Sequence, residues 1–255
     1  MIILITNDDG IYSHGIKALK EALSDLGDVW VVAPSGQQSG VSHSFSFFRP
    51  LRVHKIKSNG STFGYAVDGT PADAAKIALR HLLPEKPALV LSGINNGENN
   101  GINIMYSGTV AGAMEGALVG VPSIAVSQTW SDSEDYAVSA RVARYFAEKT
   151  LNEGLPYGTM LNVNVPMLPF EQIKGIRVVE QAESFYADEI ERRKDPRGTE
   201  YYWIGGTHAM IAPERESDMT VIKNGYVTVT PISARATDHR MLSEINGWGL
   251  ALESR

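Results

Sequence analysis

The order of apolar segments near the N-terminus constrains the fold of this chain more than any other feature. Residues 1–6 form a continuous apolar, β-branched run, and a second apolar run covers 29–33. Between them, apolar residues recur at spacings of three and four from His14 to Leu26. The two runs are typical of buried parallel strands, and the spacing between them predicts an amphipathic helix. Strand, helix and strand within about 33 residues form a βαβ unit, whose crossover should be right-handed.

The same alternation continues through the middle of the chain. We expect further helices over 71–83, 110–119 and 135–151, and further buried strands over 88–91, 123–126 and 160–165. With 255 residues, 43% of them hydrophobic, the chain can bury a substantial core. The sequence therefore predicts an α/β fold with a mostly parallel sheet.

Two segments depart from this alternation. Residues 51–67 contain two strand-like runs around Ser58-Asn59-Gly60-Ser61, which predicts a β-hairpin inserted beside the main sheet. From about 174 to 235 strands alternate with polar stretches and no helix is expected until the end. Within it, the highly charged segment 187–198 is interpreted as a solvated turn. We therefore expect residues 1–255 to form a single domain with a hairpin insertion and a β-rich C-terminal extension.

Charge and composition exclude several classes of function. The net charge of -6 argues against a protein that holds a nucleic-acid backbone over a broad face, because such binding needs clustered Lys and Arg. The chain contains no cysteine, so disulfides, thiolate nucleophiles, zinc–thiolate sites and iron–sulfur clusters are excluded. No apolar run approaches the roughly 18 residues of a membrane span, and no signal peptide precedes the first strand, so we expect a cytoplasmic location.

Polar residues follow three of the expected strands. Asp8 and Asp9 follow the first, a loop with Ser39 the second, and a loop with Asn95 the strand that should end at Leu91. Loops at the carboxyl ends of parallel strands converge on one crevice. Two adjacent carboxylates repel unless a cation or proton lies beside them, and neutral oxygens from Ser39 and Asn95 would complete a Mg²⁺ or Mn²⁺ site. Alternatively, one Asp caps the next helix and the other is solvated.

The stretch from Tyr106 to Ala113 has the composition of a tight turn that opens a helix of small residues. Backbone N–H groups at a helix start, with Ser and Thr hydroxyls, can hold phosphate oxygens. The alternative is that these residues cap the helix and allow it to pack closely on the sheet. His43, in the Ser39 loop, can assist proton transfer or anchor that loop. The other histidines show no metal-ligand spacing.

Five motifs along the chain resemble the stationary-phase survival protein SurE family of nucleotide phosphatases. They are Thr6-Asn7-Asp8-Asp9-Gly10, Ser39-Gly40, Asp68-Gly69-Thr70-Pro71-Ala72-Asp73, Ser92-Gly93-Ile94-Asn95 and Tyr106-Ser107-Gly108-Thr109-Val110. Two later segments, 201–206 and 224–231, are similar to the family's C-terminal signatures. The resemblance covers nearly the whole chain, and the order and spacing of the motifs are specific.

The resemblance implies a metal-dependent 5′-nucleotidase with a Rossmann-like three-layer core, whose β-rich extension is exchanged between subunits of a homodimer or homotetramer. It places one divalent cation on Asp8, Asp9, Ser39 and Asn95. We expect phosphate to be held by Asn96, Ser107, Gly108 and Thr109, with accessory roles for Asn7, Gly40 and His43. The chain departs from the family at Gly101-Ile102-Asn103-Ile104, where acidic residues are usual, which leaves the substrate preference of that rim open.

We expect water activated by the cation to attack the phosphorus of a nucleoside 5′-monophosphate, with Asp8 or Asp9 accepting the proton. Nucleoside 3′-monophosphates and short polyphosphates are further candidate substrates. Two alternatives stay open at this point. Asp8 can act as a covalent nucleophile, although such enzymes usually carry Asp-x-Asp. The protein can also be a regulatory module that binds a nucleotide without hydrolysing it.

Overall fold

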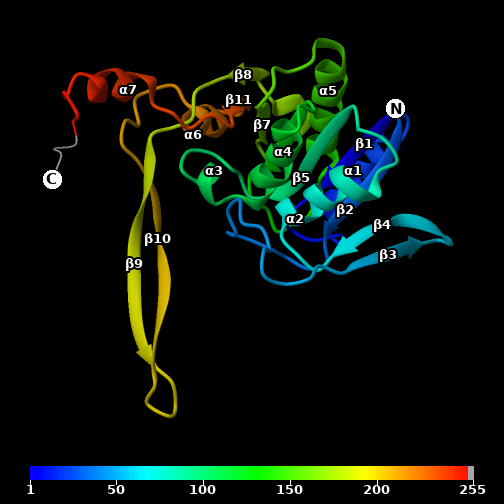
Figure 1. The fold of residues 1–255 in the computed structure, drawn as a ribbon, viewed down its shortest axis with the longest axis horizontal. Helices are drawn as coiled ribbons and strands as arrows, with labels where there is room; N and C mark the ends of the chain where they lie inside the picture. The colour runs from blue at the N-terminus through cyan, green and yellow to red at the C-terminus, as the bar shows by residue number, and fades with distance from the viewer. Residues whose placement is uncertain (252–255) are drawn as a thin grey trace.

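The computed structural model describes residues 1–251, and its centre is a nine-stranded sheet (Figure 1). The strand order across the sheet is β3-β4-β2-β1-β5-β6-β7-β11-β8. The strands are β1 (Ile2–Thr6), β2 (Asp28–Pro34), β3 (Val53–Ser58), β4 (Ser61–Val67), β5 (Leu89–Asn96), β6 (Ser123–Gln128), β7 (Thr159–Val165), β8 (Ile176–Val178) and β11 (Val227–Ser233). The six strands from β4 to β7 in this order pair in parallel, whereas β3 and β11 run antiparallel to β4 and β7.

Helices cover both faces of the sheet, which gives the expected three-layer architecture. The helices of the core are α1 (His14–Leu23), α2 (Pro71–Ile77) continued by the π-helical turn η1 (Ala78–Leu82), α3 (Asn103–Tyr106), α4 (Gly108–Leu118) and α5 (Ala137–Glu153). One face packs against α1 and α5, which contact each other, and the other packs against α2 and α4. The prediction of an α/β fold with a mostly parallel sheet is confirmed.

The predicted first βαβ unit forms for local reasons that the sequence shows. The Ser13 hydroxyl caps α1 by accepting a hydrogen bond from Ile16 N at 3.4 Å. The apolar stripe Ile16, Leu19 and Leu23 is fully buried against the sheet, and each such side chain contributes about 1.5–3 kcal/mol to folding. The helix ends at Leu23, three residues before the expected end at Leu26.

The strand order reverses between β1 and β5. From β1 the chain proceeds outward through β2 to β4, and it then returns to the other side of β1 and proceeds through β5, β6 and β7. In open α/β sheets the loops separate at such a point, so a crevice opens beyond the carboxyl ends of the two central strands. The ends of β1 and β5 are therefore where a ligand site is expected.

The C-terminal part differs from the sequence prediction in two respects. The segment 187–198 is not a solvated turn, because β9 (Ser184–Lys194) runs through most of it and pairs antiparallel with β10 (Glu200–Met210). Neither face of this two-stranded ribbon is buried, so its strands lack the alternation of apolar and polar residues that predicts a strand. A charged segment of this kind therefore resembles a turn in sequence. A short helix, α6 (Asp218–Lys223), also precedes β11, and α7 (His239–Asn246) follows it.

The β9–β10 hairpin, residues 184–210, forms a separate two-stranded sheet that extends away from the body of the molecule (Figure 1). We call this hairpin the arm. Its side chains are largely solvent-exposed, including Trp203 (59%) and Ile204 (78%). Within residues 1–251, no helix combines the length and apolar character needed to cross a lipid bilayer.

Candidate active site

A cavity of about 240 Å³ lies at the carboxyl ends of β1 and β5, at the point where the strand order reverses. Its lining residues come from four loops and the start of the arm: Asp8, Asp9, Gln37, Ser39, Gly40, Asn95, Asn96, Gly97, Glu98, Asn99, Asn103, Tyr106, Ser107 and Tyr186. The structure thus brings together seven of the predicted site residues in one cavity. The other four lie next to them, as described below.

Asp8 is the most buried acidic group of the cavity, with 6% of its surface exposed. The Thr109 hydroxyl donates a hydrogen bond of 2.5 Å to Asp8 Oδ1. Burial raises the pKa of Asp8, while the Thr109 hydroxyl and the backbone N–H groups of Thr109 and Gly108 act in the opposite direction. The positive end of α4 is therefore directed at a carboxylate of the chain itself.

Gly108 and Thr109 make a contact that the sequence did not predict. Their donors face Asp8, and the expectation that both hold phosphate oxygens stays a prediction. A Cβ atom at Gly108 would lie 2.8 Å from Asp8 Cβ, so a glycine is needed for this approach. The predicted alternative of close packing also holds, because a Cβ at Gly112 would lie 2.7 Å from Thr6 Cγ2. Ser107 caps α4, its Oγ accepting from Val110 N at 3.1 Å, and lines the cavity.

Asp9 has a different environment from that of Asp8. Its Oδ2 is buried and has no hydrogen-bond partner within the described residues. Burial, with the adjacent charge of Asp8 as second cause, raises the pKa of Asp9 from 3.8 to about 6, although the backbone N–H of Asn96 opposes the change. A buried carboxylate oxygen without a donor is costly unless a cation or proton neutralises it.

The two asparagines at the end of β5 present their amides differently. Asn95 donates from Nδ2 to Gly97 O at 2.7 Å, which leaves its Oδ1 free to accept or to bind a cation. Asn96 exchanges two hydrogen bonds with the backbone of Ser131, at 2.8 and 3.0 Å, so its amide is already occupied. β5 continues to Asn96, five residues beyond its expected end at Leu91, and this extension carries both amides to the cavity.

The Ser39 loop is anchored by the buried carboxylate of Glu115. His43 Nε2 and Lys76 Nζ each lie 2.8 Å from the carboxylate of Glu115, whose side chain is only 6% exposed. Burial acts to raise the pKa of Glu115, but the hydrogen bonds from His43 and Lys76 hold it below its usual value. Of the two roles considered for His43, this contact fits the anchor of the loop, and the role stays a prediction.

Asn7 and Gly40 complete the predicted set. The Asn7 amide donates to Gly10 O at 2.9 Å and to Ser13 Oγ at 2.8 Å, and its Oδ1 accepts from Gly10 N at 3.2 Å. It thereby shapes the turn that presents the two aspartates. Gly10 itself has φ +92°, a conformation that favours glycine. Gly40 lines the cavity beside Ser39, whose hydroxyl accepts from the Gln37 amide at 3.0 Å.

The residues of the cavity fit a hard divalent cation. Within residues 1–251 there is no group of three or more His, Cys, Asp or Glu side chains arranged to hold a metal. The carboxylate pair is instead accompanied by neutral oxygens of Ser39 and Asn95, a donor set that Mg²⁺ and Mn²⁺ accept with water in the remaining positions. The unpartnered Oδ2 of Asp9 supports the fit.

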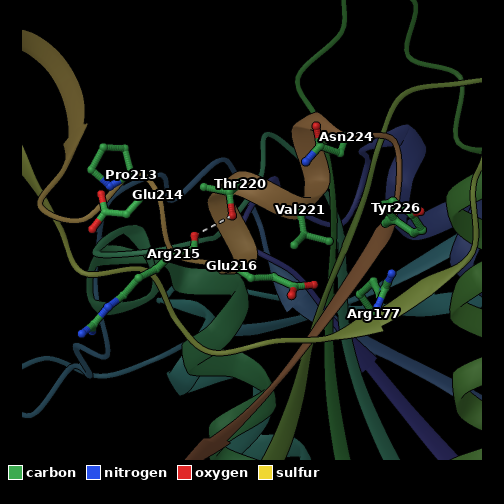
Figure 2. Close-up of a pocket in the computed structure, with 9 residues that line it drawn as sticks. All are labelled: Arg177, Pro213, Glu214, Arg215, Glu216, Thr220, Val221, Asn224 and Tyr226. Carbon is green, nitrogen blue, oxygen red and sulfur yellow. Dashed lines mark hydrogen bonds between the residues drawn. The ribbon is translucent and has the colours of Figure 1, made fainter.

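Figure 2 shows another cavity, of about 390 Å³, formed by α6 and the segments around it. Its lining mixes Arg177 and Arg215 with Glu214 and Glu216, and the hydroxyl of Thr220 is engaged with Arg215 O at 3.1 Å. This cavity does not contain the carboxylate pair, and its charges are of both signs. The smaller cavity at the strand ends is therefore the candidate active site.

Comparison with known proteins identifies the family of the chain. A sequence model of the family described as "Survival protein SurE" matches residues 3–188. The chain belongs to the SurE family. A protein of Symbiobacterium thermophilum named "5′-nucleotidase SurE" is 44% identical over 98% of both chains, and one of Myxococcus xanthus with the same name is 46% identical over 96% of this chain and 92% of its own. The crystal structure of the SurE protein from Aquifex aeolicus superposes with a TM-score of 0.84 at 44% identity, covering 97% of this chain and 99% of that one.

Some residues of the cavity were not assigned to the site from the sequence. Asn103, Tyr186 and Glu98 had no site role, and Tyr106 was quoted in a turn and in a family motif without one. Tyr186 could not be placed, because it lies 79 positions beyond Ser107 on the arm. Glu115 had a detectable signal, since it is a lone acidic residue in a helix of otherwise small and apolar residues.

Proposed function

We propose that the protein is a divalent-metal-dependent 5′-nucleotidase that releases phosphate from nucleoside 5′-monophosphates. The observation that carries the proposal is the adjacent pair Asp8 and Asp9. Asp8 accepts a hydrogen bond from Thr109, while Asp9 Oδ2 has no donor within residues 1–251. Both face a cavity shared with Ser39, Asn95 and Ser107. Relatives of near-equal length carry the name 5′-nucleotidase, which supports the same activity here.

We assign Asp8, Asp9, Ser39 and Asn95 as the residues that hold one cation, with Mg²⁺ or Mn²⁺ best suited to their oxygen donors. When bound, the cation supplies a site for a phosphate oxygen and lowers the pKa of a water molecule. Thr109 and the N-terminus of α4 hold Asp8 in position and oppose the rise in its pKa that burial causes. The Ser107 hydroxyl is the donor of the α4 turn that remains open towards phosphate.

Asp9 is the better candidate for proton acceptor. Asp9 Oδ2 is buried in the cavity wall with no hydrogen-bond partner among residues 1–251, whereas Asp8 Oδ1 accepts from the Thr109 hydroxyl. Asp8 is more buried and already hydrogen-bonded, which suits a ligand better than the covalent nucleophile considered above. A phosphorylated Asp8 trapped by rapid quench and found by mass spectrometry would decide for the nucleophile.

The test is phosphate release from adenosine monophosphate with and without a chelator. We expect release in Mg²⁺ or Mn²⁺, none with chelator, and none from Asp8→Asn at saturating metal, while the variant keeps the wild-type circular dichroism spectrum. Binding of the nucleotide without release of phosphate by the wild type would favour the regulatory module. Release by Asp8→Asn equal to the wild type would refute the metal assignment. A panel with 3′-monophosphates and short polyphosphates defines the substrate range.

We further propose that the chain is a single α/β domain that carries a hairpin at about 51–67 and a β-rich extension at about 174–235. Exchange of this extension between subunits would form a homodimer or homotetramer. The arm supports this, because β9 and β10 pair only with each other within the described residues and leave Trp203 and Ile204 exposed. Light scattering of the wild type and of Ile204→Lys tests it. A wild-type monomer at micromolar concentration contradicts it. The cytoplasmic location remains a prediction.

A further inference from the structure

Two aromatic side chains line the same cavity as the carboxylates. Tyr106 is the last residue of α3, and Tyr186 lies near the start of β9. Their ring centroids are 6.0 Å apart with an interplanar angle of 64°. Although they contact each other, 49% of Tyr106 and 40% of Tyr186 remain exposed. The cavity therefore has a wall with uncovered aromatic surface.

The Tyr186 ring is held in place by its neighbours. His208, on β10, stacks on it with centroids 5.0 Å apart and an interplanar angle of 15°. The Tyr186 hydroxyl donates to Asn103 Oδ1. His208 is in turn hydrogen-bonded through Nε2 to Ser184 Oγ at 3.0 Å. A ring supported in this way loses little conformational freedom when a ligand stacks on it.

Buried hydrogen bonds join the base of the arm to the loop that carries Tyr106. Asp218, fully buried, accepts from Gly101 N at 3.0 Å and from Ala182 N at 2.9 Å. Ser184 Oγ accepts from Ile102 N at 2.8 Å. These bonds tie two segments about 80 positions apart in the sequence, so the two rings keep a constant relation to each other.

The aromatic wall is next to the groups assigned to phosphate. Tyr106 directly precedes Ser107, so their Cα atoms are about 3.8 Å apart. The residues that line the cavity in the described part of the chain include no Lys or Arg. Apart from the carboxylates of Asp8, Asp9 and Glu98, the side chains of the cavity lining are neutral amides, hydroxyls and aromatic rings. Such a surface suits an uncharged planar group attached a short distance from a phosphate.

We propose that Tyr106 and Tyr186 form the subsite that binds the nucleobase of the substrate by stacking. This inference rests on the proposed nucleotidase function and adds to it the place and the chemistry of base recognition. Every base has a π-face, so the subsite accepts purines and pyrimidines alike, and purines more tightly because their ring area is larger. The arm thus supplies half of the subsite in addition to any role in assembly.

The experiment compares adenosine monophosphate with ribose 5-phosphate, which carries the same phosphate and sugar without the base. In the wild type we expect a KM for ribose 5-phosphate about 5- to 100-fold above that for the nucleotide, the range that one base–aromatic stack provides. Tyr106→Leu and Tyr186→Leu should raise the KM for adenosine monophosphate by several-fold and leave that for ribose 5-phosphate unchanged. Tyr106→Phe should behave as the wild type, since the ring is kept.

The matched control is Tyr145→Leu, on the exposed surface of α5 and outside this cavity, which should change neither KM. Equal KM values for the two compounds in the wild type, or equal losses for both in the Leu variants, would overturn the subsite while leaving the nucleotidase activity intact. If the wild type releases no phosphate from either compound, the proposed function fails. Calorimetric titration with adenosine monophosphate and ribose 5-phosphate then still decides whether the aromatic wall selects the base.

Discussion

Asp9→Asn is expected to stabilise the metal-free protein at pH 7.5 while it abolishes phosphate release. Asp9 Oδ2 is buried without a hydrogen-bond partner, and Asp8 is the adjacent residue. In the absence of a cation the folded state therefore carries an ionised carboxylate that the unfolded chain would solvate fully. Asparagine keeps the shape of the side chain and an oxygen for the N–H of Asn96, but it removes the charge.

The size of the effect follows from the pKa of Asp9. A rise from 3.8 to about 6 corresponds to about 3 kcal/mol of destabilisation once both states are ionised. Since Asp9 is only partly buried, solvent screening reduces this to about 1–2 kcal/mol. Because the pKa of Asp9 is raised in the folded state, its protonation favours folding. This contribution to stability is complete below pH 3.8 and is lost as the pH rises through about 6. The stability of the variant relative to the wild type should therefore be greatest above pH 6 and decrease towards pH 4.

Urea unfolding with a chelator, at several pH values between 4 and 7.5, measures this difference. Asp132→Asn, which changes an exposed aspartate, is the matched control and should be close to the wild type at every pH. Excess Mg²⁺ or Mn²⁺ should stabilise the wild type and not Asp9→Asn, because only the wild type binds the ion in the folded state. A variant that is less stable than the wild type at pH 7.5, or a difference independent of pH, would refute the reasoning.

Three further substitutions test the supports of the site. Thr109→Val removes the hydroxyl that donates to Asp8 at 2.5 Å, so the metal concentration for half-maximal phosphate release should rise about 10- to 100-fold. Thr109→Ser keeps a hydroxyl and should require a metal concentration close to that of the wild type. Gly108→Ala introduces a Cβ 2.8 Å from Asp8 Cβ, so turnover at saturating metal should fall at least tenfold. The free energy of unfolding should fall by about 1–2 kcal/mol. Unchanged turnover would show that Asp8 can shift freely. Glu115→Gln weakens the 2.8 Å contact with His43. We expect the free energy of unfolding, measured in urea at pH 7.5, to fall by about 1–3 kcal/mol. The difference between variant and wild type should shrink as the pH falls and Glu115 of the wild type becomes protonated.

Much of the core was predictable because its signals are local. The apolar spacing around Leu19 depends only on neighbouring residues, and these side chains are buried as expected. The same is true of α2, where Thr70 and Asp73 form a capping box at the predicted start. Helix and strand ends were less certain. β5 extends to Asn96, because its pairing with β6 resumes at Asn95 and Asn96 after an irregularity.

Residues 187–198, which include most of β9, were misread as a turn because their sequence resembles that of a loop. Polar and charged residues such as Glu189, Arg192 and Lys194 alternate with few apolar ones, and no buried face produces a periodic signal. Its pairing with β10 is set by backbone hydrogen bonds between segments joined by a turn at 195–199. Such pairing leaves little trace in composition when both faces of the ribbon are exposed.

By itself, the sequence determined the α/β class, the order of the elements and the strand ends from which Asp8, Asp9, Ser39 and Asn95 reach the cavity. These follow from periodicity and from the rule that loops meet at the carboxyl ends of parallel strands. What each group faces follows only from the tertiary structure. It directs the N-terminus of α4 at Asp8, leaves Asp9 Oδ2 without a donor in the described part of the chain, and brings Tyr186 of the arm to Tyr106. Contacts between residues distant in sequence depend on packing, which no local pattern encodes.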